Sequence, residues 1–107
     1  MTSFDKREES FEKKFAMDEE LRFKAMARRD KLLGLWAAEK LGLSGAEAEA
    51  YAKALVITDV EPPGEDDVFR RIRADFDAKS VAQSDHQIRR TMDELMVEAV
   101  AQIRAAT

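Results

Sequence analysis

The feature that most constrains the fold is a long stretch, residues 3–41, that contains no proline and a single glycine, Gly34. Alanine, leucine, lysine, arginine and glutamate dominate this stretch, and all five are good helix formers. At about 1.5 Å per residue, a helix of this length extends for about 58 Å. The stretch therefore predicts one long helix, and Gly42 follows it directly as a C-terminal cap.

The apolar face of this predicted helix changes character along its length. Phe4, Phe11 and Phe15 fall within about 40° of one another and form a narrow stripe, which residues 18–20, all acidic, interrupt. Beyond them the apolar positions spread over roughly 200°, as in a helix packed inside a bundle. These wider positions are Leu21, Phe23, Ala25, Met26, Leu32, Leu33, Trp36, Ala37 and Leu41. One helix is thus predicted to have two parts, a first part with a narrow phenylalanine stripe and a second part that packs inside a bundle.

Three shorter helices are predicted after Gly42. Ser44 and Glu47 make a capping box for a helix from 46 to about 57, and the prolines of the stretch TDVEPPG, residues 58–64, end it. Acidic residues then open a helix from 65 to about 79, and Ser84 with Gln87 caps the last one, 85–106. No stretch alternates with a period of two residues. The fold class predicted is all-α, a four-helix bundle. The expected inward residues are Ala48, Tyr51, Ala52, Leu55, Val68, Phe69, Ile72, Phe76, Ile88, Met92, Leu95, Met96, Ala99 and Ile103.

The helix lengths leave the start of the chain uncovered. The last helix, at about 33 Å, matches residues 21–42 in length, so no element remains to cover residues 4–18. We therefore expect an N-terminal arm, residues 1–19, that is partly disordered when free, and a four-helix bundle formed by residues 20–107. Such an arm is either disordered, folded back on the bundle, or a helix that docks into a groove of another protein, and the pattern favours the last.

Composition limits the classes of function. The chain has 107 residues, which suits one domain, or a small domain with an appendage, and it has no cysteine, which excludes disulfides and thiolate metal sites. The net charge of −4 disfavours nucleic-acid binding. Neither a secretory signal nor an apolar run of about 20 residues is present, so we expect a soluble intracellular protein without membrane insertion.

No arrangement of residues points to catalysis. The single histidine, His86, stands at the start of a predicted helix without a cysteine, serine or second histidine in a recognisable arrangement. Trp36 and Tyr51 are better explained as packed residues than as an aromatic cage. Phosphate-binding glycine motifs are missing. We therefore expect a protein that is not an enzyme and has no cofactor, with weak nucleotide binding by the bundle left open.

Several runs resemble a known family. They are FDKREESFEKKFAMDEE at residues 4–20, ARRDKLLGLWAAEKLGL at 27–43, Tyr51, and PPGEDDV at 62–68. In this order and spacing they resemble the ζ subunit of alphaproteobacterial F-type ATP synthases, a small inhibitor of the catalytic F1 sector.

The resemblance implies an activity. In such a protein the N-terminal segment enters the interface between an α and a β subunit of the F1-ATPase at a catalytic site and blocks rotation in the direction of ATP hydrolysis. The implied partners are these two subunits, with the central γ subunit as a further candidate, and the implied location is the bacterial cytoplasm, attached to the membrane-bound ATP synthase through F1. The implied anchors and rim charges are Phe4, Phe11 and Phe15 together with Arg7, Glu8 and Glu12.

The main alternative is a helical adaptor or self-associating interaction module. In that case the phenylalanine stripe pairs with a copy of itself, and the arm drives dimerisation. A third hypothesis, an enzyme or nucleotide sensor, has no motif in its support.

Overall fold

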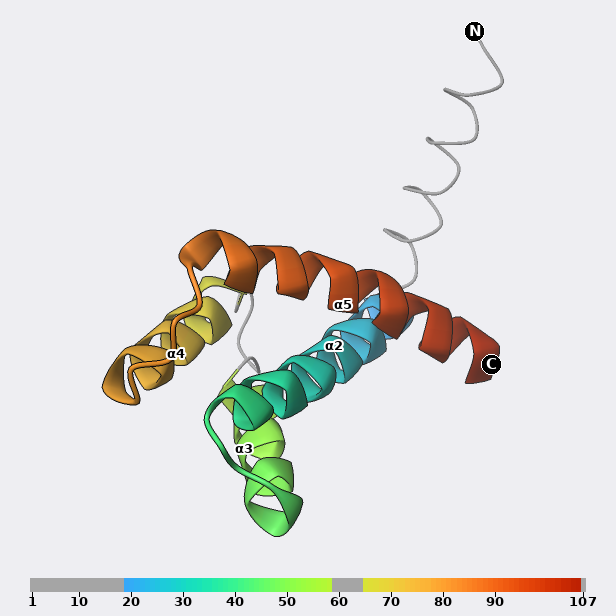
Figure 1. Cartoon of the computed structure of the whole chain (residues 1–107). Helices are drawn as coiled ribbons and strands as arrows, with labels where there is room; N and C mark the ends of the chain where they lie inside the picture. Colours follow the sequence, from blue (N-terminus) through green and yellow to red (C-terminus); the bar gives the residue numbers. More distant parts are fainter. Residues whose placement is uncertain (1–18, 59–64, 107) are drawn as a thin grey trace, which may run out of the picture.

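The computed structural model describes residues 19–58 and 65–106, which form four α-helices (Figure 1). These are α2 (Glu19–Lys40), α3 (Gly45–Thr58), α4 (Glu65–Ala78) and α5 (Asp85–Ala106). Within these ranges there is no strand, and each helix that the sequence predicts there is present, so the all-α, four-helix prediction is confirmed. The predicted arm lies outside the described residues except for Glu19, and the boundary between the arm and the bundle stays a prediction.

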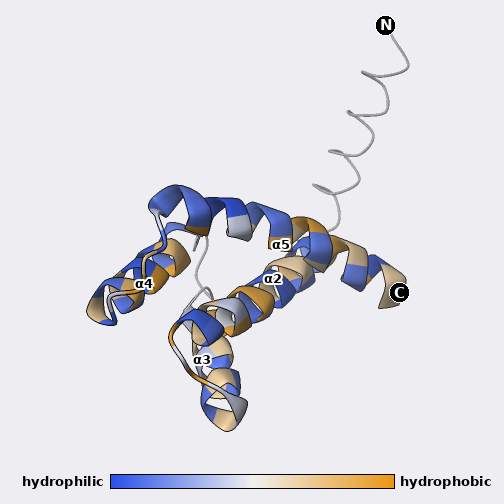
Figure 2. Cartoon of the chain, viewed as in Figure 1, coloured by the Kyte–Doolittle hydropathy of each residue, from blue (hydrophilic) through white to orange (hydrophobic). Residues whose placement is uncertain are grey.

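The central helix of the body is α2. It packs against α3 and also against α5, which crosses it, while α4 lies toward the C-terminal end of α2 (Figure 1). Hydrophobic segments recur along α2, and hydrophilic colours cover most of the visible face of α5 (Figure 2). This distribution is expected for a helix that buries a wide face next to one that buries a narrow stripe.

All four helices contribute side chains to one core cluster. Its apolar residues are almost fully shielded from solvent, and each burial of a large side chain of this kind stabilises the fold by about 1.5–3 kcal/mol. The members are Leu33, Ala37, Leu55, Val68, Ile72, Phe76, Ile88 and Met92. All eight are residues that the periodicity of the sequence placed on apolar, inward faces.

Small residues set the distance between α2 and α3. A Cβ atom added at Gly34 would lie 2.5 Å from the Cα atom of Ala52, so the two backbones approach too closely for any side chain at this position. The contact between α2 and α4 is made by large side chains instead. Phe76 of α4 is fully buried and meets Trp36 of α2 edge-on, with ring centroids 5.6 Å apart. The α2–α3 contact is therefore a close seam of small residues.

Two of the three predicted caps have the expected geometry. Gly42 adopts a φ of +82° after α2, and the amide of Leu43 donates to the carbonyl of Ala38 over 2.9 Å, which closes a Schellman motif. At the start of α5, Ser84 and Gln87 exchange two hydrogen bonds, of 2.8 and 3.1 Å. The predicted capping box of Ser44 and Glu47 is wrong. No hydrogen bond joins these two described residues, because the chain enters α3 through Gly45 at a φ of +56°.

One feature of α2 differs from the prediction, and a second was not predicted. Phe23, predicted on the inward face, is 68% exposed, and the adjacent charged residues Arg29 and Asp30 are each 1% exposed. The guanidinium of Arg29 bonds to one carboxylate oxygen of Asp30 through Nε at 2.9 Å and approaches it through Nη2 at 2.8 Å. This pair neutralises two charges that the packing of α2 removes from water.

We predict that Gly34→Ala destabilises the protein. Alanine favours a helix over glycine by about 1 kcal/mol, but separating α2 from α3 outweighs this gain, for a net loss of about 1–3 kcal/mol. Urea unfolding followed by circular dichroism measures the change. A variant as stable as the parent would show that α2 and α3 can move apart without loss of stability.

We predict that Asp30→Ala lowers the free energy of unfolding by about 3–5 kcal/mol, because it removes a carboxylate to which the buried guanidinium of Arg29 bonds. Glu39→Ala, at an exposed acid of the same helix, should change it by no more than about 0.5 kcal/mol. The double variant Arg29→Met/Asp30→Ala should be more stable than Asp30→Ala alone. A double variant less stable than that single one would contradict the role of charge in this effect.

Candidate protein-interaction site

The partner-binding residues predicted from the sequence lie outside the described residues. This holds for Phe4, Phe11 and Phe15 and for the predicted rim charges Arg7, Glu8 and Glu12. Their placement and their mutual contacts stay predictions. The described surface that lies nearest to them along the chain is the first half of α2.

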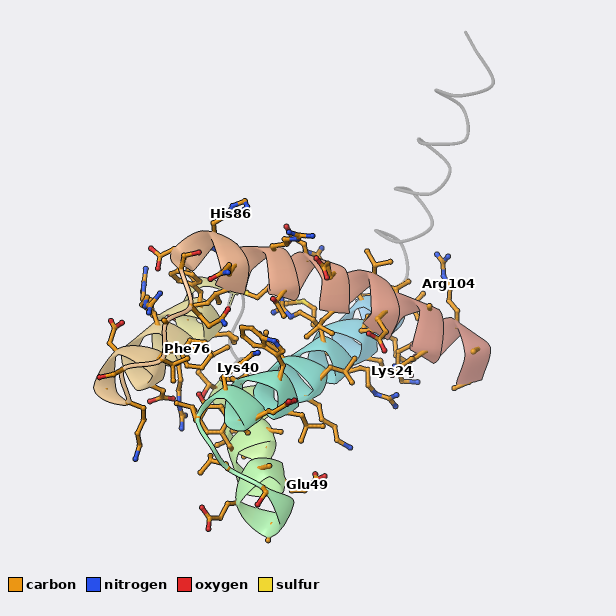
Figure 3. The ribbon with its side chains drawn as sticks, viewed as in Figure 1. Lys24, Lys40, Glu49, Phe76, His86 and Arg104 are labelled. Atoms are coloured by element: carbon orange, nitrogen blue, oxygen red, sulfur yellow. The ribbon has the colours of Figure 1, made fainter. Side chains whose placement is uncertain are left out.

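This part of α2 is rich in positive charge. Although the whole chain has a net charge of −4, residues 22–31 carry five cations and one acid, namely Arg22, Lys24, Arg28, Arg29, Lys31 and Asp30. The buried pair of Arg29 and Asp30 contributes no net charge, so the other four cations determine the potential of this surface. Figure 3 shows Lys24 projecting outward from the first half of α2.

A groove opens beside these cations. Its apolar lining comes from three helices, with Phe23 and Ala27 from α2, Val56 from α3 and Ile103 from α5. On a helix, Phe23 and Ala27 lie within about 20° of the direction of Gly34, where α2 touches α3. Because α3 ends at Thr58, the face of α2 that it covers at Gly34 is not covered at Phe23 by any helix of the described ranges. The groove is the uncovered continuation of the α2–α3 seam.

Charged side chains line the rim of this groove. Lys24 pairs with Glu20 at 3.1 Å on the exposed side of α2, and Arg28 donates a hydrogen bond of 2.8 Å to Gln102 of α5. Lys31 makes no hydrogen bond or ion pair with any other described residue, so its ammonium group is available to an external anion. The cationic part of the rim therefore comes from α2 and lies beside an apolar floor.

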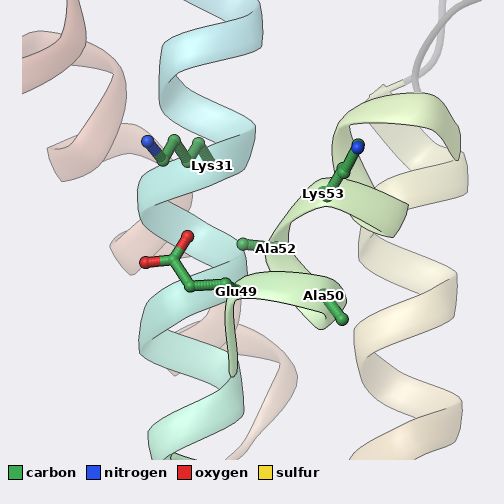
Figure 4. A pocket seen from close by; sticks show the side chains of 5 residues that line it. All are labelled: Lys31, Glu49, Ala50, Ala52 and Lys53. Carbon is green, nitrogen blue, oxygen red and sulfur yellow. The ribbon is translucent and has the colours of Figure 1, made fainter. Parts of the chain in front are cut away.

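A second hollow adjoins the groove and shares Lys31 with it. Lys31, Glu49, Lys53, Ala50 and Ala52 line this hollow; Ala52 faces α2 at the seam, whereas Ala50 points away from α2 (Figure 4). The ammonium groups of the two lysines point in different directions, and the carboxylate of Glu49 stands on the same side of the seam as Lys31. The cations do not converge on one point, so the hollow extends the cationic surface without forming a compact anion site.

Other candidate groups are accounted for by local structure. His86 is exposed and points away from the body on the first turn of α5 (Figure 3). The basic cluster of α4 is neutralised within the fold, since Arg70 pairs with Asp67 at 3.6 Å and Arg73 with Asp77 at 2.8 Å. In the described ranges no group of three or more histidine, cysteine or acidic residues is placed to hold a metal ion. Nor does any helix described here combine the length and apolarity needed to cross a lipid bilayer.

Tyr51 and Trp36 are packing residues, as predicted. The hydroxyl of Tyr51 donates a hydrogen bond of 2.6 Å to Asp75 of α4, and the guanidinium of Arg71 lies 5.8 Å from the centre of its ring. Burial, and then the hydrogen bond to Asp75, raise the pKa of the Tyr51 hydroxyl above its ordinary value. The protonated Tyr51 hydroxyl therefore links α3 to α4 through this hydrogen bond.

The sequence did not reveal the features that define this groove. Phe23 has the spacing of a core residue, and only its neighbours Arg22 and Lys24 hint at a solvent-facing position. Gly34, the one glycine within a long helical pattern, was the signal for a close contact. Neither signal shows where α3 ends relative to α2, and that placement exposes Phe23.

Fold and surface together describe a small all-α protein in which an exposed aromatic side chain, Phe23, stands in an apolar groove beside cationic side chains. That combination is typical of proteins that bind other proteins. The family model of the ATPase inhibitor subunit zeta matches residues 1–102. The chain therefore belongs to the ATPase inhibitor subunit zeta family, as its resemblance to ζ subunits implied.

A solved structure supports the fold. A protein of known solution NMR structure is 44% identical in sequence and superposes with a TM-score of 0.71, over 81% of this chain and 99% of that chain. A search of curated proteins returned no match. Because the match covers 81% of this chain, the shared fold includes much of the described body.

We predict that Tyr51 titrates above its ordinary pKa of about 10. The folded state holds this proton more tightly than the unfolded chain does, so the stabilisation is fully present below about pH 10 and declines as the pH rises further. Tyr51 is the single tyrosine, so its ultraviolet absorbance follows this one group. Asp75→Asn should bring the midpoint of the Tyr51 titration closer to pH 10. A midpoint near pH 10 in the parent protein would contradict the buried hydrogen bond.

Proposed function

We propose that this protein inhibits ATP hydrolysis by the F1 sector of an ATP synthase, with residues 1–18 inserted as a helix between an α and a β subunit at a catalytic site. The observation that carries this proposal is the family match, because it spans 102 residues from the start of the chain and so includes both the arm and the helical body. In this position the arm opposes rotation in the direction of hydrolysis.

The chemistry of residues 1–18 suits this task. On a helix Phe4, Phe11 and Phe15 form one narrow stripe, and aromatic residues are common energetic anchors of protein interfaces. Arg7, Glu8 and Glu12 flank the stripe and would pair with charges on the rim, which favours one register over others. Inhibition by occupying an interface requires no catalytic group of the inhibitor itself.

The body supports the proposal by forming a core of its own. The core cluster runs from Leu33 to Met92 and includes residues from all four described helices. We propose that the α and β subunits are the principal partners, that the γ subunit is contacted through the inserted end, and that the protein is held at the bacterial cytoplasmic membrane through F1.

We predict that hydrolysis by F1 lacking this subunit falls on addition of the full chain, and that deletion of residues 1–18 abolishes this effect. The double variant Phe11→Ala/Phe15→Ala should inhibit at least about tenfold more weakly, because it removes two buried anchors. Met17→Ala is the matched control, since on a helix Met17 lies about 220° from Phe4 and faces away from the stripe. The inhibition by each of the four proteins is measured from the steady-state rate of ATP hydrolysis by F1.

Two results would contradict the proposal. If the deletion variant inhibits as strongly as the full chain, the inhibitory activity belongs to the helical body and not to the arm. Absence of inhibition by the full chain, with its helical content and thermal unfolding intact, would leave a helical adaptor or self-associating module as the better account.

A further inference from the structure

The groove beside Phe23 exposes an aromatic side chain, whereas the core of the body is shielded from solvent. Phe23 is 68% exposed, whereas Phe76 is fully buried. The floor next to Phe23 consists of Ala27, Val56 and Ile103, and the volume of the groove is about 460 Å³. An aromatic side chain that protrudes from an apolar floor is a frequent anchor of protein interfaces.

The charge of the rim restricts what this groove can bind. Lys24, Arg28 and Lys31, all from α2, line it, in a chain whose net charge is −4. A surface with an acidic border would gain attraction from this rim, and a basic one would be repelled. The groove therefore suits an acidic protein surface that carries an apolar side chain.

The distance along the chain restricts where this partner lies. Phe15, the last proposed anchor of the arm, and Phe23 are eight residues apart. Eight residues span about 12 Å as a helix and at most about 28 Å when fully extended. If residues 1–18 lie within F1, the groove must therefore stand close to the surface of F1 around the site of insertion.

We propose that the groove around Phe23 is a second docking site for F1, which receives an acidic surface segment bordering the α/β interface that the arm enters. This inference rests on the proposed function. Once one contact has formed, the other becomes intramolecular and occurs at a high effective concentration, so a weak groove contact strengthens inhibition. The body then acts as an anchor that lengthens the residence of the arm.

The test uses the full chain with F1 lacking this subunit and measures the concentration that gives half-maximal inhibition. Phe23→Ala and the double charge reversal Lys24→Glu/Lys31→Glu should each weaken inhibition about tenfold, with maximal inhibition retained at saturation because the arm is unchanged. The charge reversal should also make inhibition less sensitive to added salt.

Matched controls exclude general effects. Val97→Ala removes an apolar side chain that is 72% exposed on α5, outside the groove. Arg70→Glu/Lys79→Glu changes the net charge by the same amount as the groove reversal, but at exposed positions in and after α4. Both controls should inhibit within about twofold of the parent. Thermal unfolding of each variant verifies that the body is intact.

The outcomes separate this inference from the proposed function. If the parent inhibits and the groove variants match it, the docking site is refuted and the proposed function stands. If no protein inhibits, both fail. Tighter inhibition by Phe23→Ala would indicate that the groove holds the arm of the free chain, and loss of a dimer in light scattering would indicate a second copy of the chain. Either result would overturn docking on F1.

Discussion

The contact between Gly34 and Ala52 is the constraint on which the arrangement of the body depends. It brings the backbones of α2 and α3 so close that a Cβ atom at residue 34 has no room. Because the two helices meet at this depth, Leu33 and Ala37 of α2 reach the same core cluster as Leu55 of α3. The larger side chains of α4 and α5 then fill the space at the C-terminal end of α2.

The same contact determines which part of α2 stays open. The face of α2 that meets α3 at Gly34 continues toward Phe23, but α3 ends at Thr58 and does not follow it. Charge is distributed along α2 accordingly. Arg29, which is removed from water, bonds to Asp30, while Lys24 and Lys31 stay at the surface beside the groove. The first half of α2 therefore combines an apolar floor with a net positive rim.

Local signals were enough to predict the helices. The ends of α5 were predictable because the Ser84–Gln87 capping box and the three- and four-residue spacing of Ile88, Met92, Ala99 and Ile103 depend only on residues near in sequence. The end of α2 was predictable from Gly42 for the same reason. Family resemblance, carried by residues 4–20 and 27–43, supplied the inhibitory activity, which no periodicity could show.

The remaining features depend on how the helices cross. Adjacent charges such as Arg29 and Asp30 are normally read as a solvated surface, and their burial follows from the neighbours of α2 in space. Phe23 has the spacing of a core residue and is exposed because α3, which packs against α2 at Gly34, does not extend over this position. The predicted arm residues, Phe4 to Phe15, lie outside the described residues, so their role stays a prediction.

The central claim is that the arm acts inside F1 while the body remains outside. Photo-cross-linking tests it most directly, with a benzoylphenylalanine placed at residue 11 of the full chain and irradiated in complex with F1. The account predicts that cross-linked peptides come from an α or β subunit at a catalytic interface. Cross-links confined to the helical body of the same chain, or to a second copy of it, would contradict the account.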